Sequence, residues 1–187
     1  AYAADTNDSP VVQVQVARVT HLTDKISHYL LKATDGAVLP RWDAGAHLDI
    51  VIAPDALRQY SLMGDPADRT CYEIAVLREE TGKGGSRLLH RIFAEGRKVF
   101  VSRPINQFPL VRDADHSFLM GGGIGLTPMI AMAHALHAEG RSFEVHYSVS
   151  HQKTAAFVPL LHSVPWADRV HVHNSQNGTR APLDAIF

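Results

Sequence analysis

The chain has 187 residues, of which 45% are hydrophobic, so it can bury a real core in one large domain or two small ones. Lys and Arg number 18 against 19 Asp and Glu, and the net charge of -1 argues against broad electrostatic binding to nucleic acid or to an anionic membrane. The single cysteine, Cys71, excludes an internal disulfide and any metal or iron-sulfur centre held by several cysteines. A reducing cytoplasm is the expected compartment.

Residues 1–10 are polar and acidic, which predicts a loose tail rather than a signal peptide, and no apolar run reaches the ~20 residues of a membrane span. Short β-favouring runs follow. The candidate strands are 11–16, 29–32, 47–52, 59–63, 72–77 and 98–102. These short strands predict a closed antiparallel β-barrel, in which only residues 86–93 have the apolar spacing of a helix.

From about residue 113 the pattern changes to longer units in which strands and helices alternate. The expected strands are 117–120, 143–149 and 169–173, and the expected helices are 127–139 and 155–162. This alternation predicts a parallel sheet with helical crossovers. We therefore expect a β-barrel domain over 11–112 and an α/β domain over 113–187. The chain stops at Phe187 only three strands into that sheet, so we expect the α/β domain to be incomplete.

A strand motif in the first half, Arg58-Gln59-Tyr60-Ser61, puts a guanidinium and a ring on one strand face, because alternate residues share a face. The Arg58 guanidinium suits a phosphate through paired hydrogen bonds, and the Tyr60 ring offers a flat apolar surface to an aromatic cofactor. Taken alone, the motif is better explained as an ordinary barrel strand with an exposed arginine.

A glycine-rich loop, Gly82-Lys83-Gly84-Gly85-Ser86, follows about a strand and a turn later and leads into the expected helix. Its glycines let backbone amides approach a phosphate, Ser86 can cap the helix, and the helix N-terminus adds partial positive charge. A flexible hairpin loop with a good cap is the alternative for this segment alone. In combination with the strand motif before it, the loop indicates a flavin site.

A second glycine-rich segment, Gly121-Gly122-Gly123-Ile124-Gly125-Leu126-Thr127-Pro128-Met129, lies between an expected strand and an expected helix. This is the context of a phosphate-binding turn, and Pro128 suits the first turn of a helix. The spacing differs from the G-x-G-x-x-G fingerprint, so it indicates a dinucleotide site only weakly. A tight turn that packs the helix on the strand is the alternative.

The twelve histidines raise the question of a metal site. His134 and His137 lie one helical turn apart and His171 and His173 share a strand face, but neither pair has an acidic or cysteine residue at a convincing spacing. A Ser-His-Asp set is not indicated either. We expect no metal site and no catalytic side chain.

Five segments in a fixed order resemble the ferredoxin-NADP reductase superfamily and, more narrowly, the phthalate dioxygenase reductase group, the flavoproteins that supply electrons to Rieske oxygenases. They are the strand motif, Ile74-Ala75-Val76, the first glycine-rich loop, Asn106-Gln107-Phe108-Pro109-Leu110, and the second glycine-rich segment. The resemblance covers almost the whole chain from about Val11. It implies a flavin-binding barrel followed by an NAD-binding α/β domain.

For the flavin, the resemblance implies FMN in preference to FAD, because the G-x-G-G-S form goes with FMN in this group. Arg58 would contact the phosphate, Tyr60 would pack along the ring system, and the Ser61 hydroxyl would approach flavin N5, which receives the hydride. The residues expected to hold the flavin are Arg58, Gln59, Tyr60, Ser61, Ile74, Ala75, Val76, Gly82, Gly84, Gly85 and Ser86.

For the nucleotide, the resemblance implies NADH. The residues expected to hold it are Gly122, Gly123, Gly125, Thr127 and Pro128, with Thr127 near both the nicotinamide and the flavin. Because the hydride passes between two cofactors, no side-chain acid or base is needed. The segment Ser150-His151-Gln152-Lys153, where the adenosine ribose would be held, has neither a clear acidic residue for NADH nor an arginine for the 2′-phosphate of NADPH.

The resemblance also implies an electron route. In this group a C-terminal plant-type ferredoxin domain holds a [2Fe-2S] centre and serves the oxygenase component, and the given chain lacks that domain. We therefore expect an NADH oxidoreductase that passes electrons through FMN to a [2Fe-2S] centre for a Rieske-type oxygenase. The alternatives are a flavin-binding fragment or docking module without productive NADH turnover, and a reductase for another acceptor such as a P450.

Overall fold

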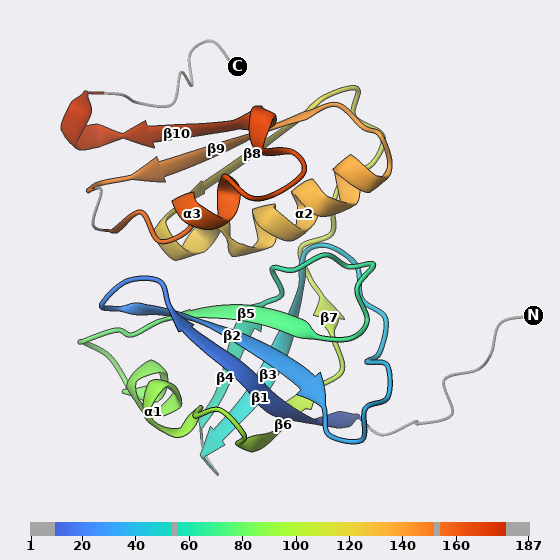
Figure 1. Cartoon of the computed structure of the whole chain (residues 1–187), viewed down its shortest axis with the longest axis vertical. Coiled ribbons are helices and arrows are strands. Elements are labelled where there is room, and N and C mark those ends of the chain that lie inside the picture. The colour runs from blue at the N-terminus through green and yellow to red at the C-terminus, as the bar shows by residue number, and fades with distance from the viewer. Residues whose placement is uncertain (1–9, 54–55, 152–153, 179–187) are drawn as a thin grey trace, which may run out of the picture.

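A computed structural model describes residues 10–53, 56–151 and 154–178 of the chain (Figure 1). The predictions for the tail 1–9, for Gln152-Lys153 and for the chain end at Phe187 lie outside these residues. Figure 1 shows an antiparallel sheet built from the first half, a parallel sheet from the second half, and the helices of the second half between them. None of the helices in the described part is both long and apolar enough to cross a bilayer.

The antiparallel sheet is the near-closed barrel that the sequence predicts. Its strands are β1 (Val11–His21), β2 (Ile26–Ala33), β3 (Ala46–Ala53), β4 (Ala56–Ser61), β5 (Tyr72–Leu77), β6 (Lys98–Ser102) and β7 (Ile105–Asn106). They pair in the order β4-β3-β6-β1-β2-β5, with β7 on β3. Alternate side chains such as Val14 and Val16 point into the core, as a half-buried strand requires.

Strand β1 runs further than the predicted 11–16. It pairs with β6 over Val11 to Gln15 and continues along β2 as far as His21. The register shifts between Val16 and Arg18, and such a bulge breaks the alternation of apolar residues that marks a strand in a sequence. The second half of β1 was therefore not predicted from the sequence.

The parallel sheet has the order β10-β9-β8, formed by β8 (Ser117–Gly122), β9 (Phe143–Val149) and β10 (Val170–Asn174). A short 3-10 helix, η1 (Gly123–Leu126), leads from β8 into α2 (Thr127–Ala138), and α3 (Val158–Leu161) follows β9. The helix predicted over 155–162 shrinks to α3. Pro159 explains this, because in a helix that began at residue 155 its ring would clash with the preceding turn.

The core continues from the barrel into the parallel sheet as one cluster of buried side chains. Helix α2 buries Ile130, Ala133 and Leu136 beneath the sheet, and Trp166 is fully buried beside His134. In the barrel, helix α1 (Gly85–Ile92) buries Leu89. Strand β5 and η1 are in contact, so the second glycine-rich segment lies against the barrel strand that precedes the first glycine-rich loop.

Candidate functional site

Two adjoining pockets lie where the barrel meets the parallel sheet. The first pocket has a volume of about 430 Å³ and brings together the strand motif, the glycine-rich loop and the η1–α2 junction. It is lined by Arg58, Gln59, Tyr60, Ser61, Ala75, Leu77, Glu79, Lys83, Gly84, Gly85, Ser86, Ile124, Gly125, Thr127 and Pro128. The volume is within the usual range for a small-molecule site.

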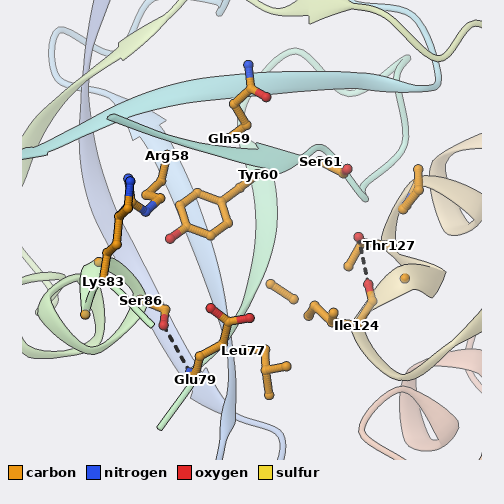
Figure 2. Close-up of a pocket in the computed structure, with 15 residues that line it drawn as sticks. Arg58, Gln59, Tyr60, Ser61, Leu77, Glu79, Lys83, Ser86, Ile124 and Thr127 are labelled. Atoms are coloured by element: carbon orange, nitrogen blue, oxygen red, sulfur yellow. Dashed lines mark hydrogen bonds between the residues drawn. The ribbon is translucent and has the colours of Figure 1, made fainter. Parts of the chain in front are cut away.

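Strand β4 presents the two faces that the sequence predicts. Arg58 and Tyr60 point to the same side, into the first pocket, whereas the Gln59 side chain points away (Figure 2). The Gln59 amide nitrogen instead donates to Asp49 Oδ1 at 3.0 Å. Gln59 therefore borders the pocket with its backbone, and its side chain links β4 to β3 in the barrel.

The glycine-rich loop lies against the Arg58 side chain. A β-carbon added to Gly85 would stand 2.5 Å from Arg58 Nε, so only glycine lets the guanidinium come this close to the backbone. The first helical hydrogen bond of α1 runs from the Leu88 amide to the Gly84 carbonyl at 3.0 Å. The backbone amides just before Leu88 therefore have no partner within the helix, as at any helix N-terminus.

Ser86 does not cap α1, contrary to the sequence-based expectation. The cap is Gly84, with a φ of 77°, and no side chain bonds to the helix start. Ser86 Oγ instead accepts a hydrogen bond from the Glu79 amide at 3.0 Å, which links the loop to the segment just after β5 (Figure 2). Since the oxygen is the acceptor there, the Ser86 hydroxyl hydrogen stays available to a ligand.

The charged residues that line the first pocket gather at one end. Figure 2 shows Arg58 and Lys83 side by side there, with Tyr60 next to them and Glu79 nearer the Ser86 side. Burial raises the pKa of Tyr60 to about 12, although the Arg58 charge opposes this. The Tyr60 ring is therefore neutral at physiological pH, beside two cations that can hold a phosphate.

The opposite end of the first pocket is built by the η1–α2 junction. Thr127 is buried, and its hydroxyl donates to the Ile124 carbonyl at 3.1 Å (Figure 2). Ser61 ends β4 on this side. An extended ligand with its phosphate at Arg58 would therefore have its other end between Ser61 and Thr127.

Three residues expected at the flavin do not line either pocket. Ile74 and Val76 are buried in the barrel core, and Gly82 is exposed with a φ of 100°. The alternation of β5 accounts for the first two, because Ala75 and Leu77 occupy the face that borders the pocket. Sequence reasoning identified the strand, but it missed Leu77, which the two-residue strand period from Ala75 would have indicated.

The sequence-based site also omitted Glu79, Lys83 and Ile124, all of which line the first pocket. Lys83 was part of the glycine-rich loop, and its charge was the signal that could have added it to the site. Ile124 lies among the glycines of the second segment, and no feature of the sequence distinguished it as a site residue.

The second pocket, of about 490 Å³, lies at the carboxyl ends of β8 and β9. It is lined by Thr23, Asp24, Lys25, Ile26, Leu77, Gly122, Gly123, Ile124, Ser148, Val149, Ser150 and Thr154. Ligands of open parallel sheets bind at this end of the strands. Leu77 and Ile124 line both pockets, so the two cavities adjoin across these two side chains. The hairpin between β1 and β2 was not expected here.

Glycine occurs at the positions of the second segment for different structural reasons. A β-carbon on Gly121 would lie 2.7 Å from Leu126 Cα, so this glycine serves the close packing of the turn. A β-carbon on Gly125 would meet nothing within 4 Å, and Gly123 has a φ of 51° that disfavours other residues. The tight-turn alternative thus explains Gly121, whereas open space at Gly125 leaves the turn accessible to a ligand.

No family model matches the chain. The carnitine monooxygenase reductase subunit of Escherichia coli (strain K12) is 37% identical over 185 residues, which are 97% of this chain and 57% of that protein. A solved structure of phthalate dioxygenase reductase matches with a TM-score of 0.88 and 35% identity, over 95% of this chain and 56% of that one. An intact type IV self-sufficient cytochrome P450 monooxygenase matches with a TM-score of 0.87 and 37% identity, over 95% of this chain and 23% of that one.

The chain spans about half the length of the curated relatives it matches. The likeness to phthalate dioxygenase reductase confirms the predicted fold class, an antiparallel β-barrel followed by a parallel α/β unit. The match covers both halves of the chain and therefore both pockets.

Proposed function

This chain is a homologue of the phthalate dioxygenase reductase group of the ferredoxin-NADP reductase superfamily, and on that premise we propose that it binds FMN in the first pocket and NADH in the second. Its reaction is then the oxidation of NADH. Bound FMN would supply the redox chemistry, in which a hydride is taken up from NADH and the two electrons leave singly to an acceptor.

The residues of the first pocket fit FMN. Arg58 and Lys83 provide two positive charges beside the backbone amides that begin α1, which suits a phosphate. The neutral Tyr60 ring offers an apolar surface for the flavin ring, and Ser61 and Thr127 border its far end. These residues bind and orient the cofactor, and none is required to move a proton.

The single observation that supports the hydride step best is that Leu77 and Ile124 line both pockets. Leu77 and Ile124 would therefore lie between a nicotinamide held near Gly122 and Gly123 and a flavin whose far end is held near Ser61 and Thr127. Both side chains are apolar and partly buried, so the junction between the two pockets is apolar. Positioning of this kind is what a protein contributes when two cofactors carry the chemistry.

We further propose that residues 11–112 bind the flavin and that residues 113–187 bind the nucleotide. We also propose that the electron acceptor is a [2Fe-2S] centre of a ferredoxin domain that serves a Rieske-type oxygenase. The proposed location of the protein is the cytoplasm. Phthalate dioxygenase reductase, which this chain resembles, is a modular structure for electron transfer from pyridine nucleotides to [2Fe-2S], and this supports the proposed acceptor.

The test is anaerobic flavin reduction. The purified chain should be yellow or take up FMN with higher affinity than FAD, and NADH should bleach the bound flavin faster than NADPH. A colourless chain that binds neither flavin would overturn the proposal. Bound flavin that NADH does not reduce would instead favour a flavin-binding module without turnover.

A second candidate acceptor is a P450 haem domain. The match to the self-sufficient cytochrome P450 monooxygenase, of which this chain covers 23%, favours it. Electron transfer assays with a plant-type ferredoxin and with a P450 haem domain distinguish the two acceptors, because only the true class of partner is reduced at a rate that follows its concentration.

A further inference from the structure

Five side chains gather on the face of the parallel sheet that lies opposite α2, and we call them the histidine cluster. They are His116, Glu144, His146, His171 and His173. In β9 the residues that alternate with Glu144 and His146, namely Val145 and Tyr147, are buried and therefore face the opposite side of the sheet. The parallel register sets His171 of β10 beside His146 of β9, so the fold joins side chains from separate segments.

The Glu144 carboxylate is the centre of the histidine cluster. Its Oε2 atom lies 3.2 Å from His146 Nε2 and 3.5 Å from His171 Nε2. One ligand atom from each of these three residues lies within 4.8 Å of the other two. A tetrahedral zinc ion with bonds of about 2.0–2.1 Å separates its ligand atoms by about 3.3 Å. The two carboxylate distances already have this length.

The surroundings hold the ligand groups in place. His146 Nδ1 lies 3.0 Å from His173 Nε2, and the two rings are stacked with an angle of 3° between their planes. With an ion bound, His146 Nδ1 would donate its proton to His173 Nε2, and the His146 Nε2 lone pair would be free to bind the ion. A hydrogen bond of this kind on the distal ring nitrogen is typical of metal-binding histidines.

His116 adds an independent observation. Its Nδ1 atom is 2.7 Å from Ser142 Oγ, and its Nε2 atom is buried without a hydrogen-bond partner among the residues that the structure describes. That Nε2 atom lies 3.9 Å from Glu144 Oε1. A buried ring nitrogen without a hydrogen-bond partner is costly, and with the ring proton on Nδ1 a bound ion or its water ligand would satisfy it.

We propose that the histidine cluster binds one divalent transition-metal ion, Zn²⁺ above all, with Glu144, His146 and His171 as protein ligands. His116 or a water completes the coordination. Two imidazoles and one carboxylate suit zinc and its neighbours, whereas Mg²⁺ and Ca²⁺ prefer oxygen ligands. The expectation of no metal site came from pairs within single elements, and it did not consider Glu144.

The proposed ion would link β10, at one edge of the described sheet, to the central strand β9. None of the cluster residues lines the first or second pocket. The site is therefore separate from the proposed flavin and nucleotide sites, and its role is to stabilise the sheet. Binding of the ion to the folded chain alone raises the stability by mass action.

The test uses the purified 187-residue chain, freed of metal with EDTA and then dialysed against ZnCl₂ or MgCl₂. We expect about one Zn²⁺ per chain, a higher thermal midpoint with Zn²⁺, and no such change with Mg²⁺. CoCl₂ in place of zinc should give the visible absorption of a four-coordinate ion. Less than one bound Zn²⁺ per chain, or zinc binding without an effect on the midpoint, would overturn the proposal.

Two variants address the ligands with little risk to the fold. The His171 side chain is 46% exposed, so His171→Ala should fold, and Glu144→Gln preserves the shape of a side chain that is 39% exposed. Each should weaken Zn²⁺ binding by about tenfold or more. The control His162→Ala removes an exposed histidine outside the cluster and should bind Zn²⁺ like the wild type. Equal binding by all three variants would contradict the proposed ligands.

Discussion

The Arg58 guanidinium lies against the backbone of Gly85, so close that a β-carbon at position 85 would stand 2.5 Å from Arg58 Nε. Strand β4 and the start of α1 thus meet at one point of the first pocket. The contact makes the position of the arginine depend on a residue that has no side chain, and both residues can be tested.

Arg58→Ala should weaken FMN binding by about tenfold or more, because a charge-assisted hydrogen bond to the phosphate is lost. The circular dichroism spectrum should stay that of the wild type, since the side chain is only half-buried. Flavin fluorescence titration measures the dissociation constant. The matched control is Arg91→Ala, which removes an exposed arginine of α1 outside the pocket. An unchanged constant in Arg58→Ala would contradict the placement of the phosphate.

Gly85→Ala should weaken FMN binding although it removes no ligand atom. The added methyl group displaces the Arg58 guanidinium from the mouth of the loop. We expect the double variant Gly85→Ala with Arg58→Ala to bind FMN about as weakly as Arg58→Ala alone, because the two changes act on one interaction. Strictly additive losses in the titration would show that Gly85 acts independently of Arg58.

Tyr60 should contribute through its ring and hardly through its hydroxyl. Burial holds its pKa at about 12, so the group stays neutral up to alkaline pH. Tyr60→Phe should then retain FMN affinity within about threefold, whereas Tyr60→Ala should lose considerably more because the stacking surface disappears. The same fluorescence titration decides this. A large loss in Tyr60→Phe would mean that the hydroxyl binds the flavin.

The stability of the chain should fall in mild acid through His134 of α2. Burial, the largest cause, lowers the pKa of His134, whereas the charges of Asp65 and Glu73 oppose this and His137 adds to it. The neutral form is therefore favoured in the folded chain, where Trp166 Nε1 donates to His134 Nδ1 at 3.4 Å. The contribution is complete above the unfolded pKa of about 6.5 and is lost as the pH falls through the lower folded value.

Urea unfolding between neutral and mildly acidic pH measures this dependence. His134→Gln should reduce the slope of stability against pH below about pH 6.5, because the variant has no proton to bind. The exposed His162 provides the control, since His162→Gln should keep the slope of the wild type. Identical slopes in all three proteins would assign the acid sensitivity to other groups, among them His90, whose pKa burial also lowers.

Parts of the fold follow from the sequence alone where the local pattern and the tertiary structure agree. Strands β5, β6 and β9 have the predicted bounds because their apolar residues match the burial that the sheets impose. The pattern failed where an irregularity intervened. A bulge hid the second half of β1, and Pro159 cut the predicted helix to α3.

Some residues of the candidate site could likewise be predicted from the sequence, and others could not. The two-residue period of β4 was sufficient to place Arg58 and Tyr60 on one face. In β5 the resemblance implied the continuous run Ile74-Ala75-Val76, and of these three only Ala75 lines the pocket, because the other two side chains point into the core. The histidine cluster depends on the register of β9 with β10, and a pattern within one element does not contain that register. Contacts between residues on different strands therefore could not be predicted from the sequence pattern.

The two pockets adjoin at Leu77, which the barrel supplies, and Ile124, which the parallel half supplies. Because each half supplies one of the two side chains, the pair limits how the two halves of this fold can be recombined. A chimaera that joins this barrel to the nucleotide half of a relative inherits one member of the pair from each parent. Residues 77 and 124 should consequently be transferred together, because a mismatch in their combined volume would alter the separation of the two pockets even if each half folded as before.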